Sequence, residues 1–100
     1  MKTRVYISIP IKGKDYNYQR DLANKVAHQF QERGYDTITP FDICPSATTP
    51  YNVAMGKCIE ELLNSDEIFM CDGWENSDGC KAEFQVALIY GKKIMTGQNG

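Results

Sequence analysis

The sequence predicts an α/β domain, a parallel sheet with helices on both faces, and three observations support this prediction. Short β-branched and aromatic runs alternate along the chain with amphipathic stretches of helical period. Glycines and prolines separate the two kinds of segment. The 100 residues, 42% apolar and 24% charged, suit one globular unit. We therefore expect a single domain over residues 1–95 and a frayed tail over residues 96–100.

The first half of the chain supplies two strands and a long helix. Arg4–Ile9 (RVYISI) has the composition of a buried strand. Asp15–Arg33 is expected to be a helix because its apolar residues share one face and Gly34 suits a left-handed end. Tyr35–Thr39 is then a second short strand.

The second half continues the alternation of strands and helices. The expected segments are a proline-rich loop over Pro40–Pro50, a helix over Tyr51–Leu63, a strand over Asp66–Cys71, a loop over Asp72–Ser77, a helix over Asp78–Tyr90 and a strand over Lys92–Met95. With short connections and right-handed crossovers, this βαβαβαβ order predicts a three-layer, flavodoxin-like (Rossmann-like) parallel sheet with strand order 2-1-3-4. Ligands of such sheets bind beyond the carboxyl ends of the strands at the switch point. Here that crevice lies between the loops Ser8–Lys14 and Asp72–Gly79.

The net charge and the N-terminal segment indicate which classes of partner are not expected. Eleven basic and thirteen acidic residues give a net charge of −2, which argues against a nucleic acid polymer as partner but not against a small anion. The start of the chain shows neither a signal peptide nor a membrane span. We expect a cytoplasmic protein with no membrane partner.

The cysteine pattern predicts no metal site. Cys44, Cys58, Cys71 and Cys80 form no CxxC pair, and the one histidine, His28, falls on a polar helix face. We expect ordinary buried thiols. The first loop also lacks the glycine pattern of a dinucleotide fold and the GKS/T of a P-loop, so no cofactor is expected.

The last predicted helix carries a carboxylate away from its polar stripe. At about 100° per residue, Lys81 and Gln85 form that stripe, and Glu83 lies among apolar neighbours. A buried carboxylate is costly unless it is paired or used. Glu83 is therefore either a structural group bonded to a backbone or tyrosine, or a reactive one.

Polar residues near the crevice also have two interpretations each. Ser77 is a good N-cap, and with the backbone of Gly79 it could also hold an anion. Ser8 and Lys12 either contact a phosphate or are a turn residue and a solvated charge. Tyr6 either reaches a carboxylate across the crevice or packs in the core.

A family resemblance rests on two segments, VYISIPIKG (Val5–Gly13) and MGKCIEELLNSDEIFMCDGWENSDGCKAEFQVALIYGKKI (Met55–Ile94). Together they resemble the nucleoside 2-deoxyribosyltransferase superfamily, above all its small bacterial and phage members. In these, a strand is followed by Gly-Trp and then by Ser-x-Gly-x-x-x-Glu. Gly73-Trp74 and Ser77 to Glu83 match this pattern here.

The resemblance implies cleavage or transfer at the N-glycosidic bond of a (deoxy)nucleoside or its 5′-monophosphate. Glu83 would be the nucleophile that attacks the anomeric carbon, through an oxocarbenium-like transition state, and Tyr6 would orient it. Ser77 takes a position that is aspartate in transferases of free nucleosides and serine in relatives that hydrolyse nucleoside monophosphates. The substrate-binding residues implied are Ser8, Ile9, Gly13, Asp72, Gly73, Trp74, Ser77 and Gly79. No metal or cofactor is implied, and relatives form dimers or larger homo-oligomers.

Three positions depart from the family pattern. Ile9 stands where relatives have glycine, Asp72 where they often have proline, and Cys58 where transferases carry a base-contacting acid. A branched Ile9 side chain would restrict close approach of a ligand to the backbone. Ile9 and Cys58 favour an alternative, a non-catalytic nucleotide-binding or sensing module. A structural subunit of a larger assembly is a third possibility.

Overall fold

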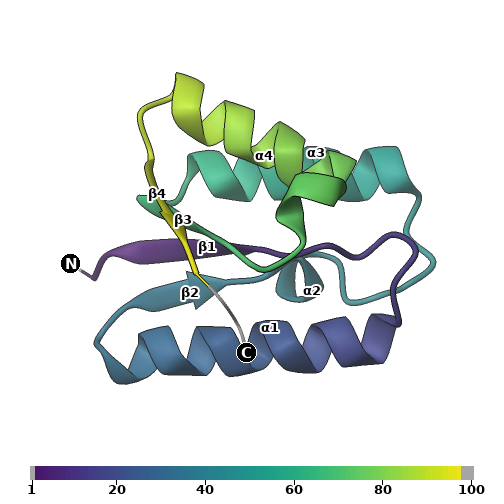
Figure 1. The fold of residues 1–100 in the computed structure, drawn as a ribbon, viewed down its shortest axis with the longest axis horizontal. Helices are drawn as coiled ribbons and strands as arrows, with labels where there is room; N and C mark the ends of the chain where they lie inside the picture. Colours follow the sequence, from purple (N-terminus) through teal and green to yellow (C-terminus); the bar gives the residue numbers. More distant parts are fainter. Residues whose placement is uncertain (1, 98–100) are drawn as a thin grey trace.

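The computed structural model describes residues 2–97 of the chain (Figure 1). Its elements are β1 (Arg4–Ser8), α1 (Tyr16–Glu32), β2 (Asp36–Ile38), α2 (Pro40–Ile43), α3 (Tyr51–Leu63), β3 (Glu67–Met70), the short 3-10 helix η1 (Trp74–Asn76), α4 (Asp78–Ile89) and β4 (Lys93–Thr96). The expected alternation of strands and helices is confirmed.

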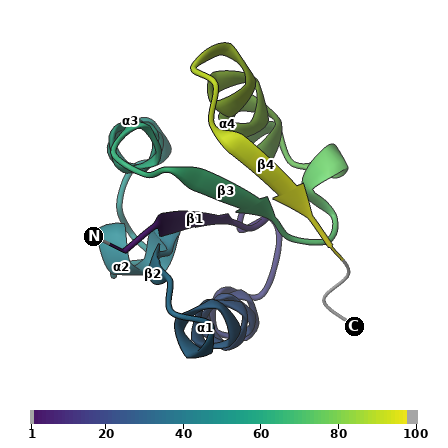
Figure 2. The same ribbon diagram turned by 90° about the vertical axis from the view of Figure 1, so that its left-hand side faces the viewer.

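The four strands form one parallel sheet in the order β2-β1-β3-β4, which confirms the predicted order. Helix α1 covers one face, and α3 and α4 cover the other, so the chain has three layers (Figure 2). The switch point lies between β1 and β3, where Ser8 pairs with Met70 at the carboxyl ends.

Alternation along β1 divides the core in two. Val5, Ile7 and Ile9 pack into the apolar cluster under α1. Tyr6 packs into the second cluster, under α3 and α4, because successive strand side chains point to opposite faces. Ser8 lies two residues after Tyr6 and so shares its face.

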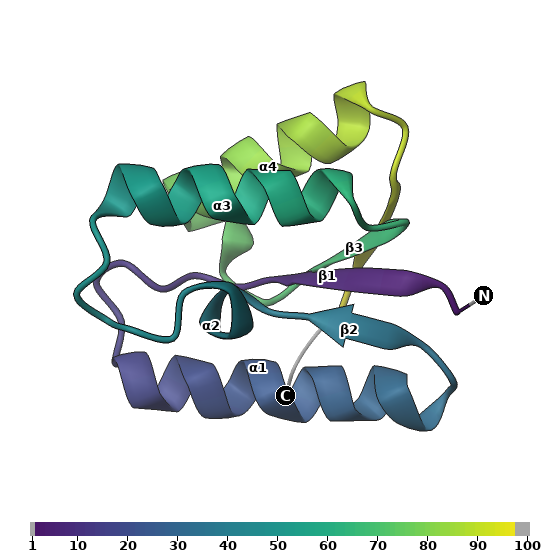
Figure 3. The same ribbon diagram turned by 180° about the vertical axis from the view of Figure 1, so that it is seen from behind.

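The segment expected as a loop over Pro40–Pro50 begins with the helix α2, so that expectation is wrong over its first four residues. Thr39 caps α2 in a reciprocal capping box with Asp42. Pro40 takes the first helical position, where a missing N–H costs nothing. Helix α2 follows at the carboxyl end of β2 (Figure 3).

The end of β4 also differs from the expected boundary. Thr96 was expected in the tail, but it is the last residue of β4 and pairs with Met70. The expectation for residues 98–100 lies outside the described residues. Within residues 2–97, no helix is long and apolar enough to cross a membrane.

Candidate active site

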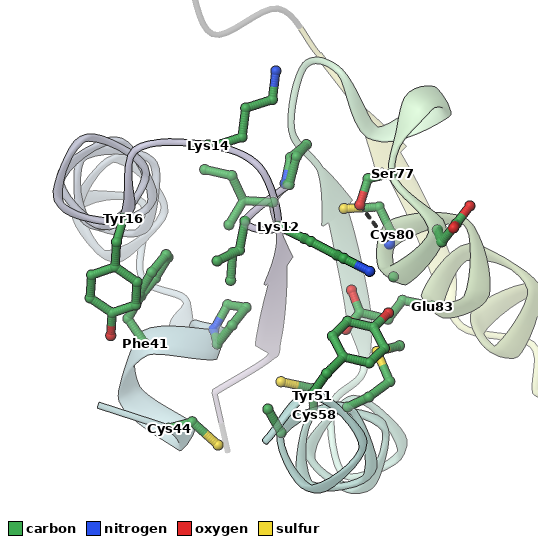
Figure 4. A pocket seen from close by; sticks show the side chains of 18 of the residues that line it. Lys12, Lys14, Tyr16, Phe41, Cys44, Tyr51, Cys58, Ser77, Cys80 and Glu83 are labelled. Atoms are coloured by element: carbon green, nitrogen blue, oxygen red, sulfur yellow. Dashed lines mark hydrogen bonds between the residues drawn. The ribbon is translucent and has the colours of Figure 1, made fainter. Parts of the chain in front are cut away.

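A cavity of about 630 Å³ lies beyond the carboxyl ends of β1 and β3, at the predicted switch point. Its walls come from the β1–α1 loop, α2 with the segment after it, and the N-terminal turns of α3 and α4 (Figure 4). Glu83 lines the cavity although only 5% of the residue is exposed. The cavity therefore lies at the crevice that the strand order indicates, and Glu83 is one of its lining residues.

Two hydroxyl groups from β1 hold the Glu83 carboxylate. The Tyr6 hydroxyl donates to Oε2 at 2.7 Å, and Ser8 Oγ donates to Oε1 at 2.7 Å. Tyr6 and Ser8 are fully buried. Because the two residues are two positions apart on one strand, their side chains lie on the same face of the sheet and point toward the same helix. Each oxygen keeps a lone pair for another contact.

Burial dominates the acidity of this group. Burial raises the pKa of Glu83 to about 7. The hydrogen bonds from Ser8 and Tyr6 act in the opposite direction and lower this pKa, but by less than burial raises it. Burial and the neighbouring carboxylate raise the pKa of Tyr6 well above its usual value. Tyr6 therefore stays a neutral donor, and Glu83 changes its charge near neutral pH.

The first turn of α4 forms the cavity wall next to Glu83. Ser77 is the N-cap, as predicted, and its Oγ accepts from the Cys80 N–H at 3.3 Å. A Cβ at Gly79 would lie 3.3 Å from the Tyr51 hydroxyl, so the tyrosine sits close against the helix backbone there. Ser77, Gly79 and Tyr51 all line the cavity.

The structure separates the predicted site residues into three groups. Those that line the cavity are Ile9, Gly73, Ser77, Gly79 and Glu83. Tyr6 and Ser8 lie beneath it and bond Glu83. Gly13, Asp72 and Trp74 are not among the lining residues. The Ser8 hydroxyl thus donates its hydrogen bond to the Glu83 carboxylate.

Two predicted binding residues have other structural partners. Trp74 stacks on Phe84 with ring centroids 4.8 Å apart and planes 16° apart. The side chain of Ile9 belongs to the buried cluster under α1 with Val5 and Ile7, so its bulk faces away from α3 and α4.

Sequence reasoning missed several lining residues. Tyr16 and Phe41 meet edge to face, 5.1 Å between centroids, and Tyr51 adds a third aromatic wall. The Thr-Pro-Phe-Asp start of α2 is the signal that would have placed Phe41 on a helix. Cys58 and Cys80 also line the cavity, and burial raises the pKa of the Cys58 thiol to about 11.

No group of three or more metal-ligating side chains gathers anywhere in residues 2–97. Three of the four cysteines, Cys58, Cys71 and Cys80, are buried, and Cys44 is half-buried. The chemistry offered by the cavity is thus that of a carboxyl group, hydroxyls, thiols and lysines.

Comparison with known proteins gives a family and a fold. The family model described as Domain of unknown function (DUF4406) matches residues 3–96. A 2-deoxyribosyltransferase from Bacillus psychrosaccharolyticus superimposes with a TM-score of 0.73 at 16% identity, over 96% of this chain and 72% of that one. A 2-deoxyribosyltransferase from Leishmania mexicana also gives a TM-score of 0.73, at 20% identity, over 96% of this chain and 64% of that one, less than two thirds of its length. No curated protein sequence matches. The predicted resemblance is confirmed at the level of the fold.

Proposed function

Because the chain belongs to the DUF4406 family and has the fold of 2-deoxyribosyltransferases, we propose that it cleaves or transfers at the N-glycosidic bond of a (deoxy)nucleoside or its 5′-monophosphate. One observation carries the proposal. A buried carboxyl group, Glu83, lines the cavity at the switch point while two hydroxyls fix its orientation from below.

The reaction takes two displacements at the anomeric carbon. An ionised Glu83 oxygen forms a bond to that carbon as the bond to the base breaks, and the electron pair leaves with the base. Water or a second base then attacks the same carbon and releases the Glu83 carboxylate, giving hydrolysis or transfer, and the proton that the attacking molecule loses balances the one that the departed base takes up. Tyr6 and Ser8 hold the carboxylate in one orientation throughout, which avoids reorganisation during attack.

The alternative function, a nucleotide-binding module without turnover, is supported by the rest of the cavity lining. The carboxylates that line the cavity are Glu83 and Asp78, and Asp78 forms an ion pair with Lys81 at 3.5 Å. Cys58 is a neutral thiol where the family resemblance calls for a base-contacting acid. Apart from Glu83 and the Lys81-paired Asp78, this lining offers no carboxyl group that could protonate a departing base.

The test is incubation with a panel of deoxynucleosides and their 5′-monophosphates, with and without an acceptor base, followed by chromatography. We expect free or exchanged base with the wild type and none with Glu83→Gln. Glu60→Gln is the matched control, because Glu60 is exposed on α3 and does not line the cavity. No base from any compound refutes the enzyme, and tight binding without release, measured by calorimetry, supports the module.

We also propose a homo-oligomer, dimer or larger. The C-terminal turn of α4 exposes three large apolar side chains, Leu88, Ile89 and Tyr90. Adjacent exposed apolar groups of this size often mark an interface. Light scattering on the purified protein tests the proposal, and a strictly monomeric particle refutes it.

A further inference from the structure

The Tyr6 hydroxyl, which bonds Glu83, has a second hydrogen-bond partner. This partner is the thiol of Cys58, on α3. Cys58 and Tyr6 belong to the same buried cluster under α3 and α4. The tyrosine has one hydroxyl proton and donates it to Glu83 Oε2, so its oxygen can only accept from the thiol. The order of donation is therefore Cys58 to Tyr6 to Glu83.

The Ser8 hydroxyl has an equivalent second partner, the thiol of Cys80 on α4. Cys80 forms side-chain hydrogen bonds with Ser8 and with Ser77, the N-cap of its own helix. Ser8 donates its proton to Glu83 Oε1, so it accepts from Cys80. The Cys80 sulfur can in turn accept from the Ser77 hydroxyl. The order of donation on this side is Ser77 to Cys80 to Ser8 to Glu83.

Both thiols can act as donors because both keep their proton at neutral pH. Burial raises the pKa of Cys58 to about 11 and raises that of Cys80 above its usual value. Cys58 is 6% exposed and Cys80 is 3% exposed, so water competes little for these bonds. Both residues line the cavity, and in the view of Figure 4 Glu83 lies between them.

The other titratable side chains around the cavity do not contribute to the raised pKa of Glu83. Burial raises this pKa, and the bonds from Ser8 and Tyr6 oppose it. The side chains concerned all line the cavity and are Lys12, Lys14, Tyr16, Cys44, Tyr51 and Asp78. A change in the donor strength of the two β1 hydroxyls should therefore appear directly in the titration of Glu83.

We propose that the two thiols, Cys58 and Cys80, are positioning residues that hold the hydroxyl protons of β1 on the Glu83 carboxylate. A hydroxyl group that accepts one hydrogen bond becomes a stronger donor in the next, because the bonds of a chain polarise one another. The thiols thereby favour the ionised form of Glu83 and fix its orientation. The inference deepens the proposed function and rests on it for the role of Glu83 as nucleophile.

The test is a carbon-13 NMR titration of the Glu83 carboxyl group, assigned by its loss in Glu83→Gln, together with the pH–rate profile of base release. Alanine at either thiol position removes a donor, so the pKa of Glu83 should rise by roughly 0.2 to 0.7. The kcat at neutral pH should fall accordingly. Serine at either position keeps a donor and should restore the wild-type pKa.

Cys71→Ala is the matched control. It removes a thiol that is also fully buried but belongs to the cluster under α1, on the other face of the sheet. It should leave the titration of Glu83 unchanged. Thermal melts establish that each variant is folded at the temperature of the titration.

A second set of variants separates the two chains of hydrogen bonds. Without the Tyr6 hydroxyl, the Cys58 thiol has no group to hold, so Cys58→Ala should have no further effect on Glu83 in a Tyr6→Phe background. Cys80→Ala should keep its full effect in that background, because it acts through Ser8.

The outcomes separate this inference from the proposed function. If the pKa of Glu83 does not rise in an alanine variant, or rises equally in Cys71→Ala, or is not restored by serine, the role of that thiol is overturned, whether or not base is released. A titration that depends on the thiols, together with no base release by the wild type, refutes the enzyme but supports the two chains of hydrogen bonds.

Discussion

Replacing Glu83 by glutamine should change how the stability of the domain depends on pH. Burial raises the pKa of Glu83 from its ordinary value of 4.5 to about 7 in the folded state. Between these two values the folded protein binds a proton that the unfolded chain releases. The stability contributed by the protonated group is therefore complete below pH 4.5 and is lost as the pH rises to 7. Glutamine keeps the shape and does not titrate.

The size of the effect follows from the same two pKa values. Each pH unit between 4.5 and 7 removes about 1.4 kcal/mol from the free energy of unfolding, so the total loss is roughly 3 to 4 kcal/mol. A domain of this size has about 5 to 15 kcal/mol in total. The loss corresponds to a fall in melting temperature on the order of 10 °C or more.

Urea unfolding from pH 4.5 to 8.5, followed by Trp74 fluorescence, measures this change. The wild type should lose stability relative to Glu83→Gln as the pH rises to 7, and the difference should be constant above that. Groups common to both proteins cancel in the comparison. Glu60→Gln is the control, because Glu60 is exposed and its variant should follow the wild type. A difference that stays flat, or that favours the wild type at high pH, would show that Glu83 is not held in a desolvated site.

Three further variants test the site. Tyr6→Phe removes a hydrogen bond that lowers the pKa of Glu83, so the pH midpoint of base release should move above 7; an unchanged pH–rate profile contradicts this role. Gly79→Ala places a methyl group 3.3 Å from the Tyr51 hydroxyl, so nucleotide affinity measured by calorimetry should fall, with a stability change below about 1 kcal/mol; unaltered affinity means that Tyr51 does not contact the ligand. Trp74→Phe should leave affinity unchanged and cost about 1 kcal/mol in thermal or urea melts, because Trp74 stacks outside the cavity; weaker binding would place it at the ligand.

The fold follows from signals that are local in the sequence. The β-branched and aromatic composition of β1 and the helical periodicity of α1 predict elements whose order restricts the sheet to few topologies. Ser77 could be assigned as an N-cap because capping depends on neighbouring residues alone. The start of α2 was equally local, in the capping box of Thr39 and Asp42, but the prolines around it favoured a loop.

The contacts of the site depend on packing between distant segments. Ser8 lies 75 residues before Glu83 in the sequence. Whether its hydroxyl bonds the carboxylate or a ligand depends on how α4 packs against β1. Gly73, with a φ of 86°, is the N-cap of η1. Trp74 is the first residue of η1, and its indole stacks on Phe84 of α4. Neither contact is encoded in the residues next to these positions, so the sequence alone could not show that Ser8 bonds Glu83 or that Trp74 stacks on Phe84.

Opposing effects set the charge of Glu83, and they come from different parts of the fold. Desolvation comes from the packing of α3 and α4 over the sheet, whereas the two hydroxyls that favour the ionised form both come from β1. With burial alone, the carboxyl group would stay protonated at neutral pH and could not attack carbon. With full solvation it would be ionised but mobile and hydrated. The hydrogen bonds from Tyr6 and Ser8 therefore do more than hold the carboxyl group in place, because they also lower its pKa, which favours the ionised form that the proposed nucleophile would need.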